Sequence, residues 1–565
     1  MSLEEISLKK LLLGLLLLQV PLYSQNGVDV SVSNLLRYGT GTRYGGGSEV
    51  LGGPEEAWDY FENLTDTRIG IADFYVGFRL LHDAPPEYGK SFTGIRKRFV
   101  EFRKEGLYLR AGDSFSMYGR GLALNVFENR TQAYDTGIDG IKAEYQTDLY
   151  KVAVTGGTID YLDVQDLTSR EHYSIRAGSA EVRPIPILTL GFAFVSGKAR
   201  LVETGIADQY DARFDIPDFF TRINVGAFDL FASYAENRIS SLSTTYPVAG
   251  THKGSAFYVS TGYVGENFGV SLEYKDYRFG VTNPSERIVR GRPYRAFAFQ
   301  NMPIVHKEHS FTLLSRYPHV ADFNDEVGSQ LDVFFTPWSK LTGSLNVAMA
   351  SRHFKYTYTG WTDPATGFQV YDAAGPRIQF FPYLSSQYSP FWEVYGDLQY
   401  FIEEGTNDYA IVGFNRRSDE ITTGVAIRSP AGTEPPVTVT RSTGIPLSVN
   451  YNVYMDWVVK ATVERQWVLV DEQGDRSSFA NQLFSVNVSK SPTFSVGLRH
   501  EFTSDEKVKD GRRFWTAIDV GFRLSTSHTI TLTAGADRGG TVCSAGVCRI
   551  VPPFSGVRVS ILSYL

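Results

Sequence analysis

The sequence predicts an all-β protein that folds as a closed antiparallel transmembrane β-barrel of about 24 strands, within a range of 22–26. Three observations support this prediction. Strand-length stretches in which apolar and polar side chains alternate recur through most of the 565 residues. The connections between these stretches alternate between short and long. Beyond the N-terminal region, no stretch is apolar enough to form a membrane-spanning helix.

The N-terminal residues 1–24 are predicted to be a signal peptide. Lys9 and Lys10 precede the apolar run 11–20, and a short polar stretch follows it. The apolar run is too short to cross a membrane comfortably as a helix. We therefore expect the chain to be exported.

The following residues, 25–67, are predicted to form an N-terminal segment made of one strand and a loop, and the barrel is predicted to occupy 68–565. The strand-like stretch 28–38 does not fit the up-and-down order of the later strands. It is therefore kept outside the predicted barrel.

Alternation is clearest in the stretch 514–538. Every second residue from Phe514 to Leu524 points to one face, whereas Trp515, Asp519 and Arg523 share the other face. Each leg of this hairpin has about ten residues, the length of a tilted strand that crosses a bilayer. Similar alternation is found at 107–112, 188–194, 268–275, 341–349, 392–400 and 494–499.

Short connections such as 104–106 and 265–267 alternate with long ones such as 116–136 and 539–553. Outer-membrane barrels have this asymmetry, with short periplasmic turns and long extracellular loops. The long connections are rich in charged residues, Pro and Gly, so we expect them to be exposed. The order of strands is broken near 279–317 and 428–448, and an extra strand within 288–299 or 437–441 would restore it. The last strand, 557–561, is predicted to close the barrel.

The most distinctive segment runs through 107–124 and 134–141. It contains Gly112-Asp113, then Gly119-Arg120-Gly121, and later Asp139-Gly140. This pattern resembles that of a porin-like family of large outer-membrane β-barrels of Gram-negative bacteria, most of which have no assigned function. The residues 60–64 with Arg68 are similar to another block of that family, and the resemblance is strongest over about residues 56–145. It implies the outer membrane of a Gram-negative bacterium as the location, and it implies no catalytic residues.

The segment Tyr118-Gly119-Arg120-Gly121 has two interpretations. Two glycines that flank an arginine just beyond a strand end permit a sharp bend. The loop can then turn inward and narrow a pore, or it can be a plain turn. Both alternatives remain open from the sequence.

No enzyme is expected. Gly112-Asp113-Ser114 resembles the nucleophile block of the GDSL lipases, but those enzymes also need an Asp-x-x-His motif. None of the nine histidines has an aspartate three residues before it. His306 and His309 form an H-x-x-H pattern without a third ligand, so we interpret them as part of a solvated loop rather than a zinc site. No metal or other cofactor is expected.

The two cysteines, Cys543 and Cys548, lie close together in the last long connection. An exported chain with two neighbouring cysteines is expected to form a disulfide there.

Charged side chains on the polar face of the strands are predicted to line the lumen. Such charges either bias an aqueous channel towards certain solutes or pair with one another in a blocked lumen. The predicted lumen-facing residues are Arg110, Glu273, Asp397, Arg499, Asp519, Arg523 and Arg558.

The function predicted from these features is a porin-like channel or transporter for small solutes. The alternative is a structural or docking barrel of a larger envelope complex with a blocked lumen. The expected partners are the lipid bilayer and either an envelope protein or further copies of the chain. A net charge of −7 without basic clusters argues against a nucleic-acid partner.

Overall fold

The computed structural model describes residues 27–44, 55–162, 170–202, 209–241, 251–279, 296–362, 364, 367–374, 379–422, 427–430, 437–472, 474–508, 512–544 and 546–564. The predicted signal peptide lies outside these residues. No helix among them is long and apolar enough to cross a membrane.

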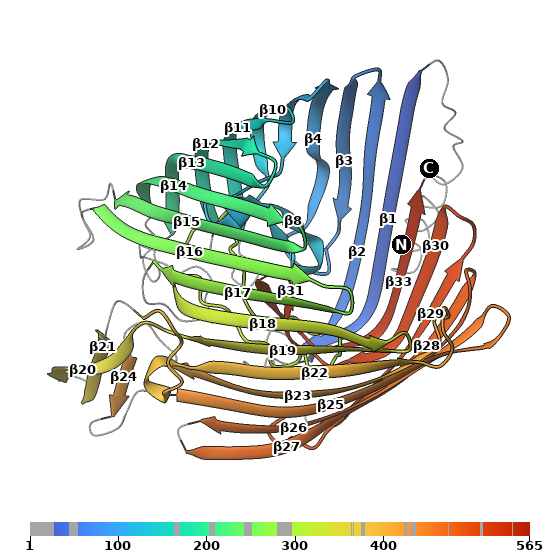
Figure 1. Cartoon of the computed structure of the whole chain (residues 1–565). Helices are drawn as coiled ribbons and strands as arrows, with labels where there is room; N and C mark the ends of the chain where they lie inside the picture. The colour runs from blue at the N-terminus through green and yellow to red at the C-terminus, as the bar shows by residue number, and fades with distance from the viewer. Residues whose placement is uncertain are drawn as a thin grey trace.

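The described residues form a closed antiparallel barrel of 24 strands, as the sequence predicts (Figure 1). The first strand pairs with the last, with Leu36 opposite Ile561 and Gly39 opposite Arg558, so the sheet has no open edge. In order around the barrel the strands are β1(Val28–Tyr44), β2(Glu55–Ile71), β3(Phe74–Asp83), β4(Phe92–Lys104), β5(Leu107–Ser114), β10(Ile138–Gln146), β11(Tyr150–Leu162), β12(Arg170–Ile185), β13(Leu188–Val202), β14(Gln209–Val225), β15(Phe228–Ser241), β16(Thr251–Val264), β17(Phe268–Arg278), β18(Asp325–Trp338), β19(Leu341–Ser351), β22(Phe391–Phe401), β23(Tyr409–Thr422), β25(Val437–Tyr454), β26(Trp457–Glu472), β27(Asp475–Lys490), β28(Phe494–Thr503), β29(Phe514–Arg523), β30(His528–Asp537) and β33(Phe554–Tyr564).

The alternating pattern separates an apolar outer face from an inner face. On β29 the outward Phe514 is 60% exposed and Ile518 is 47% exposed, whereas the inward Trp515 and Ala517 are 4% and 2% exposed. Every backbone group of a closed sheet is paired within the barrel, which allows it to cross hydrocarbon. An outward apolar belt on such a barrel is the architecture of outer-membrane proteins. The chain is therefore a protein of the outer membrane of a Gram-negative bacterium.

Short turns join the strands at one end of the barrel, and both ends of the described chain lie at this end. One turn is Ala72-Asp73, and Gly226 and Met455 belong to two others. Ala72, Gly226 and Met455 have positive φ, as tight turns often require. The long connections lie at the other end. This arrangement confirms the predicted asymmetry of periplasmic and extracellular loops.

Two details of the prediction are wrong. The barrel begins at Val28 rather than near residue 68, because β1 pairs with both β2 and β33 along most of its length. The stretch 437–441 is not an additional strand, because it is the first part of the long strand β25. Including β1 in the barrel and treating β25 as one strand gives the even number of strands.

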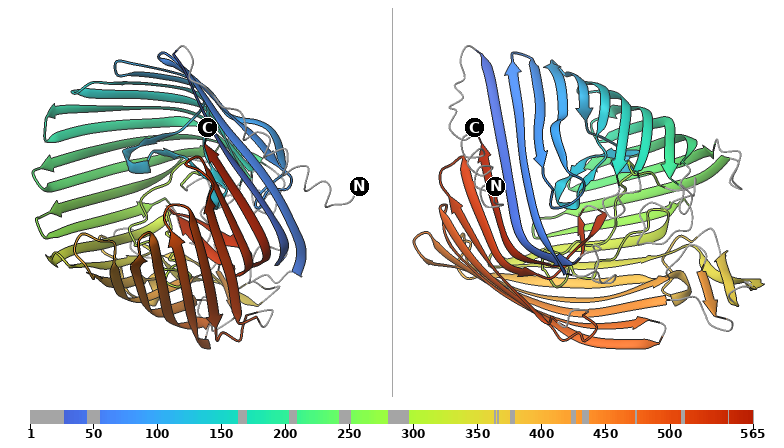
Figure 2. Two further views of the ribbon diagram at one scale, coloured as in Figure 1. Left: turned by 90° about the vertical axis from the view of Figure 1, so that its right-hand side faces the viewer. Right: turned by 180° about the vertical axis from the view of Figure 1, so that it is seen from behind.

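The remaining strands belong to the long connections. The strands β20(Lys355–Thr362), β21(Phe368–Ala374) and β24(Ile427–Pro430) form a small sheet that stands apart from the barrel (Figure 2). The others pair as two-stranded sheets: β6(Ser116–Tyr118) with β7(Leu124–Val126), β8(Glu128–Asn129) with β9(Tyr134–Asp135), and β31(Gly540–Ser544) with β32(Val547–Val551). Three short 3₁₀ turns are η2(Gly119–Gly121), η3(Arg130–Gln132) and η4(Ser386–Tyr388).

Three of the long connections do not lie exposed, contrary to the expectation from their composition. They are 115–137, the part of the β17–β18 connection from 296 to 324, and 538–553. Apolar residues within them, such as Leu122, Phe299 and Val547, are buried in one cluster with inward side chains of β11 to β17. Burial of this apolar surface holds the connections inside the barrel.

Candidate functional site in the lumen

The candidate site is the interior of the barrel, and its main element is the segment 296–324, called here the crossing segment. At one end it packs against β12 and β14. The rings of Phe297 and Phe299 lie 5.8 and 5.2 Å from the ring of Tyr173, and 4.8 and 5.4 Å from that of Phe214. Asn237 on β15 and Gln300 of the crossing segment exchange amide hydrogen bonds of 2.9 Å in both directions. This end of the segment is therefore anchored by an aromatic core.

The other end of the crossing segment reaches strands far around the barrel, where buried carboxylates hold it. His309 Nε2 lies 2.9 Å from Glu393 Oε1, and His319 lies 3.1 Å from an oxygen of Asp419. Arg316 forms an ion pair with Glu501. We call the five carboxylates that contact this segment the wall acids: Glu326 on β18, Glu393 on β22, Asp419 on β23, Glu464 on β26 and Glu501 on β28, all at most 6% exposed.

Two histidines of the crossing segment, His306 and His319, have opposite pKa shifts. Burial lowers the pKa of His306 to about 3, and nearby His319 and Lys275 add to this effect, so His306 is neutral. Burial also opposes charge on His319, but Asp419 and Glu326 outweigh it and raise the pKa of His319 to about 9. His319 is therefore an imidazolium at neutral pH, bound between two wall acids.

The second inward segment, 115–137, contains the predicted residues Tyr118, Gly119, Arg120 and Gly121. They lie against the inner wall, with Tyr118 buried and the guanidinium of Arg120 4.8 Å from the ring of Phe231. Gly119 has a φ of +54°, and a Cβ there would lie 1.7 Å from the Asp218 carboxylate on β14. Only glycine fits this position.

The crossing segment and the 115–137 segment also hold each other. The backbone N–H of Asn125 donates to the Phe299 carbonyl at 2.8 Å. Gln300 Nε2 donates to the carbonyl of Leu122 at 2.7 Å. The two connections thus form one unit inside the barrel.

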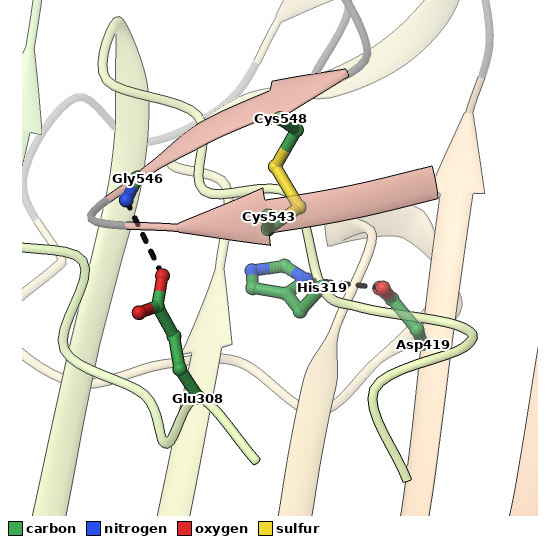
Figure 3. The surroundings of a disulfide bond; sticks show 6 residues. All are labelled: Glu308, His319, Asp419, Cys543, Gly546 and Cys548. Carbon is green, nitrogen blue, oxygen red and sulfur yellow. Dashed lines mark hydrogen bonds and ion pairs between the residues drawn. A yellow bond between two sulfur atoms is a disulfide. The ribbon is translucent and has the colours of Figure 1, made fainter. Parts of the chain in front are cut away.

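The third inward element is the hairpin of β31 and β32. A disulfide joins Cys543 and Cys548 across it, and the hairpin lies beside His319 (Figure 3). Its Gly546 N–H donates to Glu308 at 3.4 Å. Between the hairpin, the crossing segment and β22–β23 is a cavity of about 200 Å³, lined in part by His306, His309, His319, Glu393, Arg417 and Cys543.

A larger charged cavity, of about 450 Å³, lies beside the strands β1 to β5. Its lining contains four basic and three acidic side chains, among them the predicted Arg110, which donates to Glu101 at 3.1 Å. The other basic side chains are Arg68, Arg79 and Lys97, and the acidic ones are Asp66, Asp113 and Glu128. This side of the lumen is therefore lined by charges of both signs.

The other predicted charges are spread around the wall. Glu273 lies opposite Gln330, and Asp397 accepts a hydrogen bond of 2.7 Å from Ser344. Arg499 and Arg558 both bind Asp537. Asp519 accepts a hydrogen bond of 2.6 Å from Thr533, and Arg523 donates to the carbonyls of the turn residues Ser525 and Thr526 at 3.2 Å. These residues are not brought together into one site.

Sequence reasoning missed the wall acids and the crossing segment. His306 and His309, interpreted as parts of a solvated loop, are buried against β22, where His309 meets Glu393. The available signal was the apolar content of the connection just before these histidines, with Phe297, Phe299 and Met302. Long connections within a compact domain are uncommon and are often functional.

Ser114, the serine of the lipase-like block, is fully buried, and its hydroxyl donates to the Ile138 carbonyl at 3.5 Å. Within the described part of the chain, no three His, Cys, Asp or Glu side chains are placed to hold a metal ion.

Residues 66–358 and 440–565 match a family of unknown function, DUF6029. The chain belongs to this family. The match extends well beyond the stretch from 56 to 145 over which the sequence resemblance was strongest, and it agrees with the expectation of a family without assigned function. No curated protein matches the chain.

Solved structures that are similar to this member of DUF6029 include a siderophore receptor, OccK3 and a pilus usher pore. The siderophore receptor PirA from Pseudomonas aeruginosa has a TM-score of 0.45 and 8% identity, with 94% of this chain and 80% of the receptor covered. OccK3 (OpdO) from the same organism has a TM-score of 0.36 and 12% identity, with 80% of this chain and 96% of OccK3 covered. The P pilus usher (PapC) translocation pore has a TM-score of 0.39 and 9% identity, with 95% of this chain and 99% of the usher chain covered. All three scores lie below 0.5, so what these proteins transport does not extend to this chain.

Proposed function

We propose that this protein is a channel of the outer membrane for small polar solutes, and that the crossing segment closes it at rest. The segment runs through the interior from the aromatic core on β12–β15 to the wall acids on β18–β28. Solute movement would require this segment to leave its position. The proposal therefore concerns a gated pore rather than a permanently open one.

The observation that carries the proposal is the polar character of the attachment to β18–β28. The contacts include ion pairs and hydrogen bonds, such as Arg316 with Glu501 and Gln466 Nε2 with the carbonyl of Leu313 at 2.8 Å. The buried apolar side chains Leu313 and Leu314 lie beside them, but the large apolar cluster is at the other end. Water can replace such contacts, so their net contribution is small, about 0.5–1.5 kcal/mol for a typical hydrogen bond. An apolar attachment would instead expose hydrophobic surface on release. The polar end is thus the end that can detach.

The charged cavity beside β1–β5 supports a polar rather than an apolar solute. Its basic side chains are matched by acids, as in Arg79, whose Nε lies 2.8 Å from Asp66, and Lys97, whose Nζ lies 2.7 Å from Asp135. Mixed charges of this kind favour hydrated solutes and disfavour apolar ones.

Planar-bilayer recording tests the proposal. Purified protein should show long closed periods with brief openings, and the double variant Arg316→Ala/Glu464→Ala should be open for a larger fraction of time. The matched control is Arg476→Ala/Glu472→Ala, at the exposed end of β26–β27 away from the crossing segment. Silence of both the wild type and the double variant, with both folded and inserted, would contradict the proposal.

A docking barrel with a permanently blocked lumen is the second candidate. It is favoured by the aromatic core, in which the crossing segment and the 115–137 segment share one buried apolar cluster with β11–β17. In that case the inward segments are structural, and the extracellular loops contact an envelope partner or a further copy of the chain. Purified complexes with a defined partner, together with silent bilayers, are the result that this candidate predicts.

A further inference from the structure

The outer face of the barrel has a groove over strands β4, β5 and β10–β13. Its volume is about 1310 Å³, and its lining is mainly apolar. Outward side chains in the lining include Val100, Leu109, Ile141, Val154, Phe192 and Phe194. The groove lies on the belt that faces hydrocarbon, so acyl chains rather than water fill it.

Close backbone approach on neighbouring strands bends the sheet at this groove. A Cβ at Gly140 would lie 2.0 Å from the Gly156 carbonyl oxygen, and a Cβ at Gly157 would lie 2.2 Å from that of Asp139. Gly112 has a φ of +103°, and a Cβ there would lie 2.1 Å from the Arg98 carbonyl oxygen. Glycines in a strand interior mark bends of this kind. The groove is therefore set by the backbone and not by side-chain rotamers.

A cluster of cations lies at the rim of the groove nearest the long loops. Arg176 belongs to the groove lining, and the outward Lys198 lies directly opposite Arg213 on β14. Arg176 is opposite Ser196, which places it diagonally beside Lys198. All three side chains are exposed.

The three cations have no ion-pair partner among the described residues. Their neighbours are matched: Arg200 pairs with Asp211 at 3.2 Å and Arg238 pairs with Glu236 at 2.7 Å. Two acids flank Arg213 on the outward face of β14: Asp211, which pairs with Arg200, and Asp215, which lies opposite Ser196 on β13 and Arg238 on β15. Like charges directly opposite one another are unfavourable in a sheet, so the Lys198–Arg213 pair favours an anion from outside the chain.

We propose that the groove and the three cations, which we call the rim cations, form a binding site for lipid A. The acyl chains lie in the groove, and a phosphate lies against Arg176, Lys198 and Arg213. The rim cations are at the end with the long loops, which is the extracellular side, and the lipid of that leaflet carries phosphates above several acyl chains. Arginine and lysine bind phosphate oxygens through charge-assisted hydrogen bonds. This site is on the outside of the barrel and does not depend on the proposed channel.

Native mass spectrometry of the full-length, delipidated protein with purified lipid A tests this site. The triple variant Arg176→Gln/Lys198→Gln/Arg213→Gln should bind lipid A at least about tenfold more weakly than wild type, because charge-assisted contacts are lost. The control Arg200→Gln/Arg238→Gln removes cations that already have acidic partners and should bind as wild type does. The proposal would be overturned if both variants lost lipid A binding equally, or if the triple variant bound lipid A as tightly as wild type does.

The lipid used as probe separates headgroup from chain binding. Lipid A from which the phosphates have been removed should bind wild type as weakly as intact lipid A binds the triple variant. Phosphatidylglycerol should also bind more weakly than lipid A; equal binding would mean a general phospholipid site and would contradict the assignment to lipid A.

A groove variant tests the acyl-chain part. Ala143→Trp fills the groove, whereas Ala232→Trp places the same side chain on the outer face of β15 beyond it. The first should weaken lipid A binding and the second should leave it unchanged. Unchanged binding by the folded Ala143→Trp protein would show that the groove is not used.

Discussion

The backbone N–H of Leu313 donates a hydrogen bond of 2.7 Å to the Oε2 atom of Glu464. The other carboxylate oxygen accepts the N–H of Thr312 at 3.0 Å. One wall acid thus satisfies two adjacent backbone donors of a segment that begins on the opposite side of the barrel. A carboxylate in this position has few substitutes, because it must remain buried while it accepts both bonds.

Replacing this carboxylate should loosen the crossing segment. Glu464→Ala leaves the buried N–H of Leu313 and the partly buried N–H of Thr312 without acceptors, and a buried unpaired group costs about 1–3 kcal/mol. We expect faster hydrogen–deuterium exchange in 309–316 and more frequent openings in bilayers. Glu472→Gln, on the same strand but exposed, is the control. Unchanged exchange in 309–316 for Glu464→Ala would show that this contact does not hold the segment.

High pH should open the channel. The pKa of His319 is raised from 6.5 to about 9, because Asp419 and Glu326 outweigh the effect of burial. The stabilisation from its charge is complete below the unfolded value of about 6.5 and is lost as the pH rises through about 9. The ring also contacts the neutral His306 and Phe391, and Lys275 binds Glu326. Arg352 and Glu420 line the same small cavity as His319.

Open probability recorded between pH 7 and pH 10 checks this expectation. The wild type should open more as the pH rises, and His319→Asn should be more open at pH 7 and less sensitive to pH. A wild type whose open probability is constant over this range would rule out a role of this imidazolium in closure.

The glycine at position 119 should not tolerate a side chain. In Gly119→Ala the new methyl group overlaps the Asp218 carboxylate, in addition to the backbone strain of positive φ. Gly226 is a matched control, because it has a φ of +58° and no heavy atom within 4 Å of the added Cβ. We expect Gly119→Ala to lower the free energy of unfolding by about 1–3 kcal/mol more than Gly226→Ala does. Denaturant unfolding in detergent measures the difference.

The disulfide should restrain the hairpin beside the crossing segment rather than the barrel. Cys543 and Cys548 close a loop with a sequence separation of 5, for which chain entropy gives about 2 kcal/mol. Cys543→Ser/Cys548→Ser should increase exchange in 540–551 and leave exchange in β29 unchanged. Loss of protection throughout the barrel would show instead that the disulfide is needed for the whole fold.

The fold was predictable because a transmembrane barrel imposes a period of two on almost every strand. The alternation from Phe514 to Leu524 separates outward from inward side chains in the structure as the sequence predicts. The strand count was also predictable from spacing, although the position of β1 was not. Its pairing with β33 depends on residues more than 500 positions away, and no local pattern encodes such a contact.

The lumen site was less predictable. Charged and histidine residues in a long connection predict exposure, yet the side chains of His309 and His319 are buried and that of Arg316 is partly buried, because acids on distant strands bind them. The wall acids also look ordinary in sequence, since any inward position of a barrel strand can carry a charge. Their role depends on which connection reaches them, and that is a property of the folded chain.

Locking the crossing segment to the wall tests the gated-pore account most directly. The Cγ atom of Leu314 lies 3.8 Å from where a Cβ at Gly444 on β25 would stand, so Leu314→Cys/Gly444→Cys is placed to form a cross-link. The lock is made in the Cys543→Ser/Cys548→Ser background, which removes the native disulfide and itself serves as the control. The account predicts silent bilayers for the oxidised lock and openings once a reductant is added. Openings of the fully oxidised lock at the rate of its background, or silence that persists after reduction while the background conducts, would contradict it.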